Sequence, residues 1–157
     1  MDFAGLIAAA KKEAFLARAR HHATLRAMAA VGMSQAEIAK TLRVSQPAVS
    51  QRLATAKGFA SLPADVALEA AVPVLKAIAA ERGFSRLAVF GSLARGQAGT
   101  DSDVDLLAQP PEGATIGDLL DLKQVFEQIL GRRVDLVTHG ALKPGLDDDI
   151  RHQAVPL

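Results

Sequence analysis

Three long stretches of the chain carry apolar residues with helical spacing. Residues 3–31 are alanine-rich with scattered basic residues, and Gly32 supplies a stop. Residues 65–82 form a second stretch, in which Pro73 is expected to start a new segment or to kink the helix. Residues 116–130 form an amphipathic stretch that Gly131 closes. We therefore predict helices over all three.

Three short runs have the composition of buried strands. They are residues 86–90, 104–108 and 133–137, rich in β-branched residues and leucine. The turn sequence 110–113 separates the second strand from the helix over 116–130. A helix starting within the acidic run 147–149 completes the order helix, strand, strand, helix, strand, helix. This order predicts a small α/β domain.

Two short helices are predicted between residues 34 and 53. Ser34 and Glu37 have the spacing of a capping box, and Ser45 caps the next helix, where Pro47 is tolerated in the first turn. Arg43 lies in the tight turn between them and is expected to adopt a left-handed conformation, since many such turns have glycine there. This pattern predicts a helix-turn-helix.

The stretch 34–53 resembles the DNA-reading unit of bacterial repressors. The resemblance implies that six polar residues of the turn and second helix contact DNA, at base edges or at phosphates. Gln46, Ser50 and Gln51 would contact bases, and Arg43, Arg52 and Lys57 would contact phosphates. The alternative is a small helical bundle whose polar face is only solvated.

Charge divides the chain into two parts. Residues 1–60 carry nine Lys or Arg against three Asp or Glu, whereas residues 61–157 carry nine against fourteen. A basic region suits a polyanion, and an acidic one suits metal ions. Gly58 and Pro63 interrupt helical periodicity where the balance changes. We expect an α+β protein: an all-α helix-turn-helix domain (1–60) followed by a small α/β domain (61–157).

The composition excludes several classes of protein. The chain has no Cys, so disulfides and thiolate zinc sites are excluded, which fits a reducing compartment. It shows neither a signal-peptide core nor a stretch of membrane-spanning length. We expect a cytoplasmic protein with no membrane partner.

A glycine turn and two closely spaced carboxylates mark the candidate chemistry. Gly91 and Ser92 follow the first predicted strand, while Asp103 and Asp105 flank the start of the second. Period-two geometry directs both carboxylates to one face. Two such groups repel each other unless a divalent cation lies between them.

The pattern Gly91-Ser92, ten residues, then Asp103-Val104-Asp105 resembles the signature of the DNA polymerase beta superfamily of nucleotidyltransferases, and within it the minimal nucleotidyltransferases. In that family the third carboxylate corresponds to Asp135. The resemblance implies that Asp103, Asp105 and Asp135 are catalytic and hold two Mg²⁺ ions. It also implies that Gly91, Ser92 and Arg95 bind the triphosphate of ATP.

The resemblance implies transfer of a nucleoside monophosphate, most often AMP from ATP, to a macromolecular acceptor. Minimal nucleotidyltransferases resemble antitoxins that adenylylate a tyrosine of a HEPN ribonuclease toxin. This chain has no Tyr and cannot be its own tyrosine acceptor. The leading hypothesis is an antitoxin that also represses its own operon as a DNA-bound homodimer. Two alternatives are a transcription regulator that senses nucleotide without catalysis, and a nucleotidyltransferase toxin that acts on tRNA.

Overall fold

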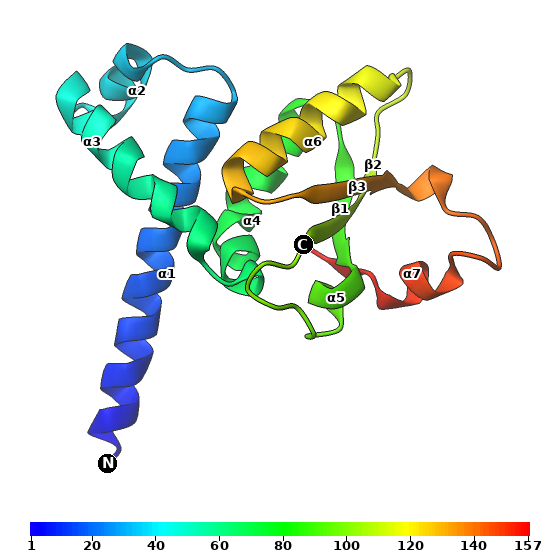
Figure 1. The fold of residues 1–157 in the computed structure, drawn as a ribbon, viewed down its shortest axis with the longest axis horizontal. Helices are drawn as coiled ribbons and strands as arrows, with labels where there is room; N and C mark the ends of the chain where they lie inside the picture. Colours follow the sequence, from blue (N-terminus) through cyan, green and yellow to red (C-terminus); the bar gives the residue numbers. More distant parts are fainter.

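The computed structural model describes all 157 residues as a helical part joined to a four-stranded sheet (Figure 1). The elements in chain order are α1 (Phe3–Ala30), α2 (Gln35–Leu42), α3 (Gln46–Ala56), the 3₁₀ turn η1 (Lys57–Ser61), α4 (Ala64–Glu81), β1 (Ser85–Phe90), α5 (Gly91–Ala94), β2 (Val104–Gln109), α6 (Ile116–Leu130), β3 (Val134–Thr138), the 3₁₀ turn η2 (His139–Ala141), α7 (Asp148–Gln153) and β4 (Val155–Pro156). The mixed α+β class is thereby confirmed.

The sheet has the strand order β3-β2-β1-β4. β1 is antiparallel to β2 and to β4, whereas β2 and β3 run parallel. The parallel pair needs a crossover, and α6 supplies it. A parallel β2–β3 pair brings equivalent ends of both strands to the same edge. The carboxylates of Asp105 on β2 and Asp135 on β3 therefore lie side by side.

The two faces of the sheet have different environments. On one face, alternate strand residues pack against α4 and α6 in the main hydrophobic core, among them Val89, Leu106 and Leu136. On the other face, Phe90 and Leu107 belong to a small cluster with residues from the C-terminal segment. This second face also carries Asp105 and Asp135, because side chains alternate along each strand.

Helix α1 is packed over only part of its length (Figure 1). Ala19, Ala23 and Ala27 recur every fourth residue, are buried, and join the core that includes α4 and α6. Their small side chains allow α1 to approach closely. Residues 3–15 are exposed throughout and extend beyond the rest of the molecule. Their helical state follows from the alanine content and from Asp2, which accepts a hydrogen bond from the Gly5 N–H as the N-cap.

Two arginines join the helical part to the α/β part. Arg26 donates from Nε to the Ile129 carbonyl and from Nη2 to the Gln128 carbonyl, both at 2.6 Å, near the C-terminal end of α6. A cation there complements the helix dipole. Arg132 donates from Nη2 to the Ala60 carbonyl at 3.2 Å and to the Leu62 carbonyl at 2.6 Å, and from Nη1 to the Thr100 carbonyl at 3.0 Å. Both contacts bridge long separations in the sequence.

The segment predicted as a linker, residues 57–63, contains the turn η1. Phe59 is only 1% exposed, belongs to the main core, and lies 5.9 Å from the Arg26 guanidinium carbon. The main core is therefore continuous across residue 61. The domain boundary at that residue stays a prediction.

Helices α2 and α3 begin at the predicted caps. Ser34 and Glu37 form the reciprocal capping box, and Ser45 accepts from the Ala48 N–H. Arg43 has φ +54°, so the expected left-handed conformation is confirmed. Ile38 and Val49 pack with Leu25 of α1 in a separate small core. The helix-turn-helix interpretation of this unit stays a prediction.

Other expectations need correction. Pro73 starts no new helix, because α4 runs unbroken from Ala64 to Glu81. Pro73 has no N–H to donate to the Glu69 carbonyl one turn earlier, and the helix tolerates this missing hydrogen bond because both residues are exposed. β1 contains an unpredicted irregularity, because the pairing with β2 shifts between Ser85 and Ala88. The short strand β4 was also unpredicted. No helix has the length and hydropathy needed to cross a membrane.

The buried position of Phe59 gives a first prediction. Replacing Phe59 with Ala should lower the free energy of unfolding by about 3–5 kcal/mol, since a buried aromatic ring is lost from a continuous core. Urea denaturation followed by circular dichroism measures this change. Phe15→Ala is the matched control, because Phe15 is 45% exposed. Its cost should stay below about 1 kcal/mol; equal losses would contradict the packing described.

Candidate active site

The site begins where β1 ends at Gly91. Gly91 has φ +68°, and a Cβ added there would collide with the Asp105 Oδ2 oxygen. Asp105 lies opposite Phe90 in the β1–β2 pairing, so its carboxylate reaches the backbone that leaves β1. Glycine is therefore required twice over, by backbone conformation and by close approach of a carboxylate.

Three carboxylates lie on the same face at this edge of the sheet. Asp103 immediately precedes β2 and Asp105 follows two residues later, so both extend from the same face. Asp105 pairs directly with Asp135 in the parallel register of β2 and β3. Asp103 and Asp135 are exposed and Asp105 is half-buried. The three acidic residues predicted from the sequence thus lie on one face of adjoining strands.

Their charges affect one another. The pKa of Asp105 is raised, first by burial and then by the negative charges of Asp135 and Asp103, whereas Arg95 lowers it. The raised pKa means that the charged form of Asp105 is disfavoured in the folded protein. A positive charge brought to this edge would relieve the repulsion.

Magnesium fits the chemistry of these donors. Carboxylate oxygens are hard ligands of the kind Mg²⁺ prefers, and their negative charges lack full compensation by Arg95. The side chains are not already gathered into a group of three or more with metal-binding geometry. The chemical type of the donors therefore suits Mg²⁺.

The predicted phosphate-binding residues occupy the turn after β1. Gly91, Ser92, Leu93 and Ala94 form the single turn α5, with Ser92 half-buried. The Ser92 carbonyl accepts from the Gln97 N–H at 2.9 Å, which folds the following loop back onto α5. Arg95 follows directly and donates to the side-chain oxygens of Gln97 and Gln153, both at 3.1 Å.

Two residues near the site were missed by sequence reasoning. Gln153 ends α7 and holds Arg95, although 58 residues separate them. Arg132 holds the Thr100 carbonyl just before the acidic strand and is partly buried. Neither belongs to a local motif, so no signal in a single sequence points to them.

A cavity of about 560 Å³ adjoins Leu107 on the carboxylate-bearing face. Arg86, His139 and Arg151 contribute cationic or polar groups to its lining. Arg86 has φ +52° at the irregularity in β1, and its carbonyl lies 2.9 Å from His139 Nε2. Left-handed backbone at a non-glycine residue is uncommon and often occurs beside functional sites.

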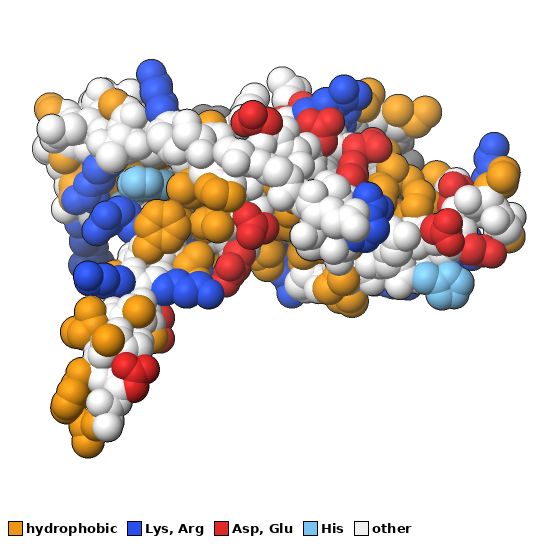
Figure 2. All heavy atoms as spheres, turned by 60° about the horizontal axis from the view of Figure 1, so that its bottom comes forward, with side chains coloured by type: hydrophobic (Ala, Val, Ile, Leu, Met, Phe, Trp, Pro, Cys, Tyr) orange, Lys and Arg blue, Asp and Glu red, His pale blue; other side chains and the backbone are white.

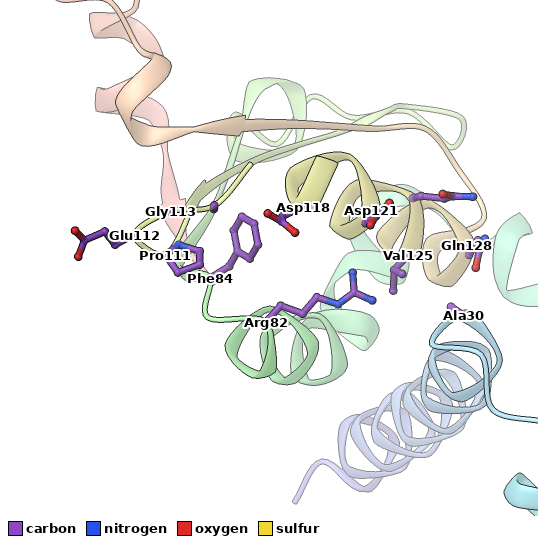
Figure 3. Close-up of a pocket in the computed structure, with 12 residues that line it drawn as sticks. Ala30, Arg82, Phe84, Pro111, Glu112, Gly113, Asp118, Asp121, Val125 and Gln128 are labelled. Atoms are coloured by element: carbon purple, nitrogen blue, oxygen red, sulfur yellow. The ribbon is translucent and has the colours of Figure 1, made fainter. Parts of the chain in front are cut away.

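A second cavity, of about 690 Å³, is not lined by Asp103, Asp105 or Asp135 (Figure 3). It lies between α4, α6 and the loop after β2, where Figure 3 shows Asp118 and Asp121 on one side and Arg82 on the other. Asp118 is already engaged by Thr115 in the capping box of α6. Its acidic lining does not suit a triphosphate.

The six predicted DNA contacts are all exposed and lie on more than one side of α3. Gln46 and Ser50 line a shallow depression that reaches the start of α2 at one residue, Gln35, whereas Gln51 and Arg52 line another with His21 and His22 of α1. Arg43 ends α2 and Lys57 starts η1. Figure 2 shows Lys and Arg side chains gathered beside a histidine, close to where α1 leaves the body of the molecule.

Comparison with known proteins identifies the class. The nucleotidyltransferase domain family matches residues 74–155. The protein adenylyltransferase MntA of Thermococcus cleftensis is 38% identical over 73 residues, covering 46% of this chain and 74% of that protein. A protein of Methanocaldococcus jannaschii, MJ0435, whose name carries a proposed protein adenylyltransferase activity, is 39% identical over 75 residues, covering 48% and 81%.

A solved structure gives the same result. It is described as a proposed minimal nucleotidyltransferase and superposes with a TM-score of 0.55 at 40% identity, covering 61% of this chain and 97% of that one. The chain therefore belongs to the nucleotidyltransferase domain family and is a nucleotidyltransferase enzyme. Within that family its catalytic part is similar to minimal nucleotidyltransferases.

The contact between Gly91 and Asp105 gives a prediction with an internal control. Gly91 and Gly96 have nearly equal φ angles, +68° and +67°, but an added Cβ at Gly96 meets nothing within 4 Å. Ala at either position should cost about 1–2 kcal/mol of stability through backbone strain. Only Gly91→Ala should also displace the Asp105 carboxylate and reduce nucleotidyl transfer, by about a hundredfold or more. Pyrophosphate release measures the activity; equal activities would contradict the assigned contact.

The raised pKa of Asp105 gives a prediction for stability. Between the ordinary pKa of 3.8 and the raised value, the folded protein holds more protons than the unfolded chain, so stability falls as the pH rises through that window. Asp105→Asn should therefore increase the free energy of unfolding at pH 7 in EDTA, and the gain should shrink below pH 3.8. Urea denaturation at both pH values tests this. Asp121→Asn, an exposed position in α6, should show no comparable gain.

Proposed function

We propose that this enzyme transfers AMP from ATP to a hydroxyl group of a protein and releases pyrophosphate. The observation that carries the proposal is the placement of three carboxylates on one face of adjoining strands, with Asp105 paired to Asp135 and beside Gly91. Asp103 and Asp135 are exposed, so a large acceptor can approach them. The relatives named as protein adenylyltransferases support a protein acceptor.

The proposed reaction is a single displacement at the α-phosphorus of ATP. The acceptor oxygen forms a bond to the α-phosphorus while the bond from that phosphorus to the bridging oxygen breaks, and pyrophosphate leaves with the electron pair. Asp103, Asp105 and Asp135 would hold Mg²⁺, which supplies charge neutralisation and lowers the pKa of the attacking hydroxyl. Asp135 lies on β3 and accepts the hydroxyl proton.

The remaining residues position the polyphosphate. Ser92 offers its hydroxyl, and the backbone of α5 offers N–H groups, to the terminal phosphate. Arg95 offsets the charge that develops on the leaving pyrophosphate. Its orientation depends on Gln153, which accepts a hydrogen bond from Arg95 Nη1.

We further propose that the acceptor is a HEPN-type ribonuclease toxin and that the chain acts as its antitoxin. The support is the likeness to MntA together with the absence of tyrosine, which directs tyrosine modification to another chain.

Transfer of radioactive label tests the proposal. The purified chain, Mg²⁺, ATP labelled at the α-phosphate and the product of the neighbouring gene should yield a labelled protein band, whereas ATP labelled at the γ-phosphate should not. Asp103→Asn and Asp135→Asn should each reduce labelling by about a hundredfold or more, and Asp121→Asn should leave it unchanged.

The same assay with total tRNA added distinguishes the alternatives. A label removed by nuclease but not by protease would favour the toxin that acts on tRNA. Tight ATP binding with no transfer would favour the regulator that only senses nucleotide. Either result would overturn protein adenylylation.

We also propose that α2 and α3 bind DNA, so that the protein represses its own operon. The capped helices, the left-handed turn at Arg43 and the net charge of +6 over residues 1–60 support this second activity. Gln46, Ser50 and Gln51 would face bases. Arg43, Arg52 and Lys57 would contact phosphates.

Fluorescence anisotropy with DNA from upstream of the gene tests this activity. Affinity should fall steeply as salt rises, because phosphate contacts release counterions. Arg52→Ala should weaken binding about tenfold and make the salt dependence shallower. Lys143→Ala removes a charge from the exposed surface of the α/β part and should change neither. A DNA affinity that changed neither with salt concentration nor with Arg52→Ala would contradict the proposal.

A further inference from the structure

The loop between α5 and β2 leads directly to Asp103 and has few contacts of its own. Within it, residues 99–102 form a turn. The Gly99 N–H donates to Ser102 Oγ at 2.7 Å, and the Ser102 N–H donates to the Gly99 carbonyl at 3.3 Å. Residues 99–101 and Asp103 are exposed. Packing in the core therefore does not fix this turn, although the turn immediately precedes a predicted metal ligand.

One guanidinium joins the turn to the rest of the molecule. Arg132, which lies between α6 and β3, donates from Nη1 to the Thr100 carbonyl at 3.0 Å. This is the only hydrogen bond between residues 98–103 and another part of the chain. From Nη2 the same side chain donates to the carbonyls of Ala60 and Leu62, which precede α4. Figure 1 shows the loop after α5 reaching toward the start of α4.

The segment that bears Arg132 also contacts the chain just after Asp103. The Arg133 carbonyl accepts a hydrogen bond from the Val104 N–H at 3.0 Å, so the backbone is held on both sides of Asp103. Asp135 follows Arg133 by two residues, within β3. This segment therefore sets the position of Asp103 relative to Asp135.

The placement of Arg132 is costly for stability. Its Nε is buried without a hydrogen-bond partner, and burial lowers the pKa of its guanidinium, whereas the charge of Asp101 raises it. A buried donor without a partner costs free energy. Arg26 already joins the helical part to α6 through two short hydrogen bonds. The contact that Arg132 adds is the one with the loop before Asp103.

We propose that Arg132 is a positioning residue for nucleotidyl transfer, which orders residues 99–102 before the metal binds. Binding of Mg²⁺ by Asp103 is then not opposed by the entropy of ordering the loop. This inference rests on the proposed role of Asp103 at the metal site. Arg26 is the matched control, because it is also partly buried and donates to carbonyls of distant segments, but not to this loop.

Amide hydrogen exchange of the metal-free protein, measured by NMR, tests the ordering. In Arg132→Gln, the amides of Gly99 and Ser102 should exchange about tenfold faster than in the wild type, because the turn loses its contact at Thr100. Arg26→Gln should leave both amides unchanged. Equal exchange in the wild type and in Arg132→Gln would overturn the proposal.

Manganese binding tests the consequence for the metal site. In the presence of α,β-methylene-ATP, which cannot release pyrophosphate, the dissociation constant of Mn²⁺ should rise about tenfold in Arg132→Gln and stay unchanged in Arg26→Gln. Electron paramagnetic resonance measures free Mn²⁺. If Asp103→Asn leaves Mn²⁺ binding unchanged, the proposed metal site and this inference are both wrong. If Asp103→Asn abolishes binding while Arg132→Gln does not weaken it, only the positioning role is wrong.

Kinetics distinguish positioning from a purely structural role. In Arg132→Gln, the Mg²⁺ concentration for half-maximal pyrophosphate release should rise about tenfold, whereas kcat at saturating Mg²⁺ should fall less than about threefold. Arg132→Lys keeps the charge but not the planar set of donors, so its Mg²⁺ requirement should be intermediate. That variant carries the test if Arg132→Gln does not fold. A lower kcat with an unchanged Mg²⁺ requirement, as expected for Arg26→Gln, would overturn the proposal.

Discussion

The parallel pairing of β2 with β3 places Asp105 directly beside Asp135 and brings like charges together at one edge of the sheet. The remaining fold supports that arrangement. The apolar face of the same strands packs against α4 and α6, and this burial fixes the register on which the carboxylates depend. Gly91 leaves space for the Asp105 carboxylate at the end of β1. The energetic cost of the acidic edge is offset by hydrophobic packing on the opposite side of the sheet.

Two arginines explain why the helices and the sheet form one structure. Arg26 donates to carbonyls near the end of α6, and Arg132 donates to carbonyls on both sides of the chain's midpoint, at Leu62 and Thr100. Each guanidinium donates to carbonyls from elements that are distant in the sequence, so its loss would remove hydrogen bonds that are partly buried at Ile129 and Leu62. The α/β part is thereby attached to α1, whose other side packs against α2 and α3.

The sequence predicts what is local and periodic. The bounds of α6, the capping box at Ser34 and the left-handed Arg43 follow from residue type and spacing, and the three carboxylates follow from the family signature. Contacts between distant segments do not follow in this way. Burial of Phe59 beneath α1, the contact of Arg95 with Gln153, and the strand β4 are decided by tertiary packing. Pro73 remained within α4 because its site is exposed and tolerates a missing hydrogen bond.

The contact between Arg95 and Gln153 has a consequence for the protein's synthesis. During translation, α1, α2 and α3 leave the ribosome first and contain every residue of their own small core. The turn after β1, which is predicted to bind phosphate, is made later. Its Arg95 gains the contact with Gln153 only when that residue has emerged, and β1 gains its second neighbour only with Val155 and Pro156. The incomplete chain therefore lacks the full arrangement around its carboxylates. Residues 153–156 are therefore made after the helices of the small core, yet they complete the contacts around β1 and the turn that follows it.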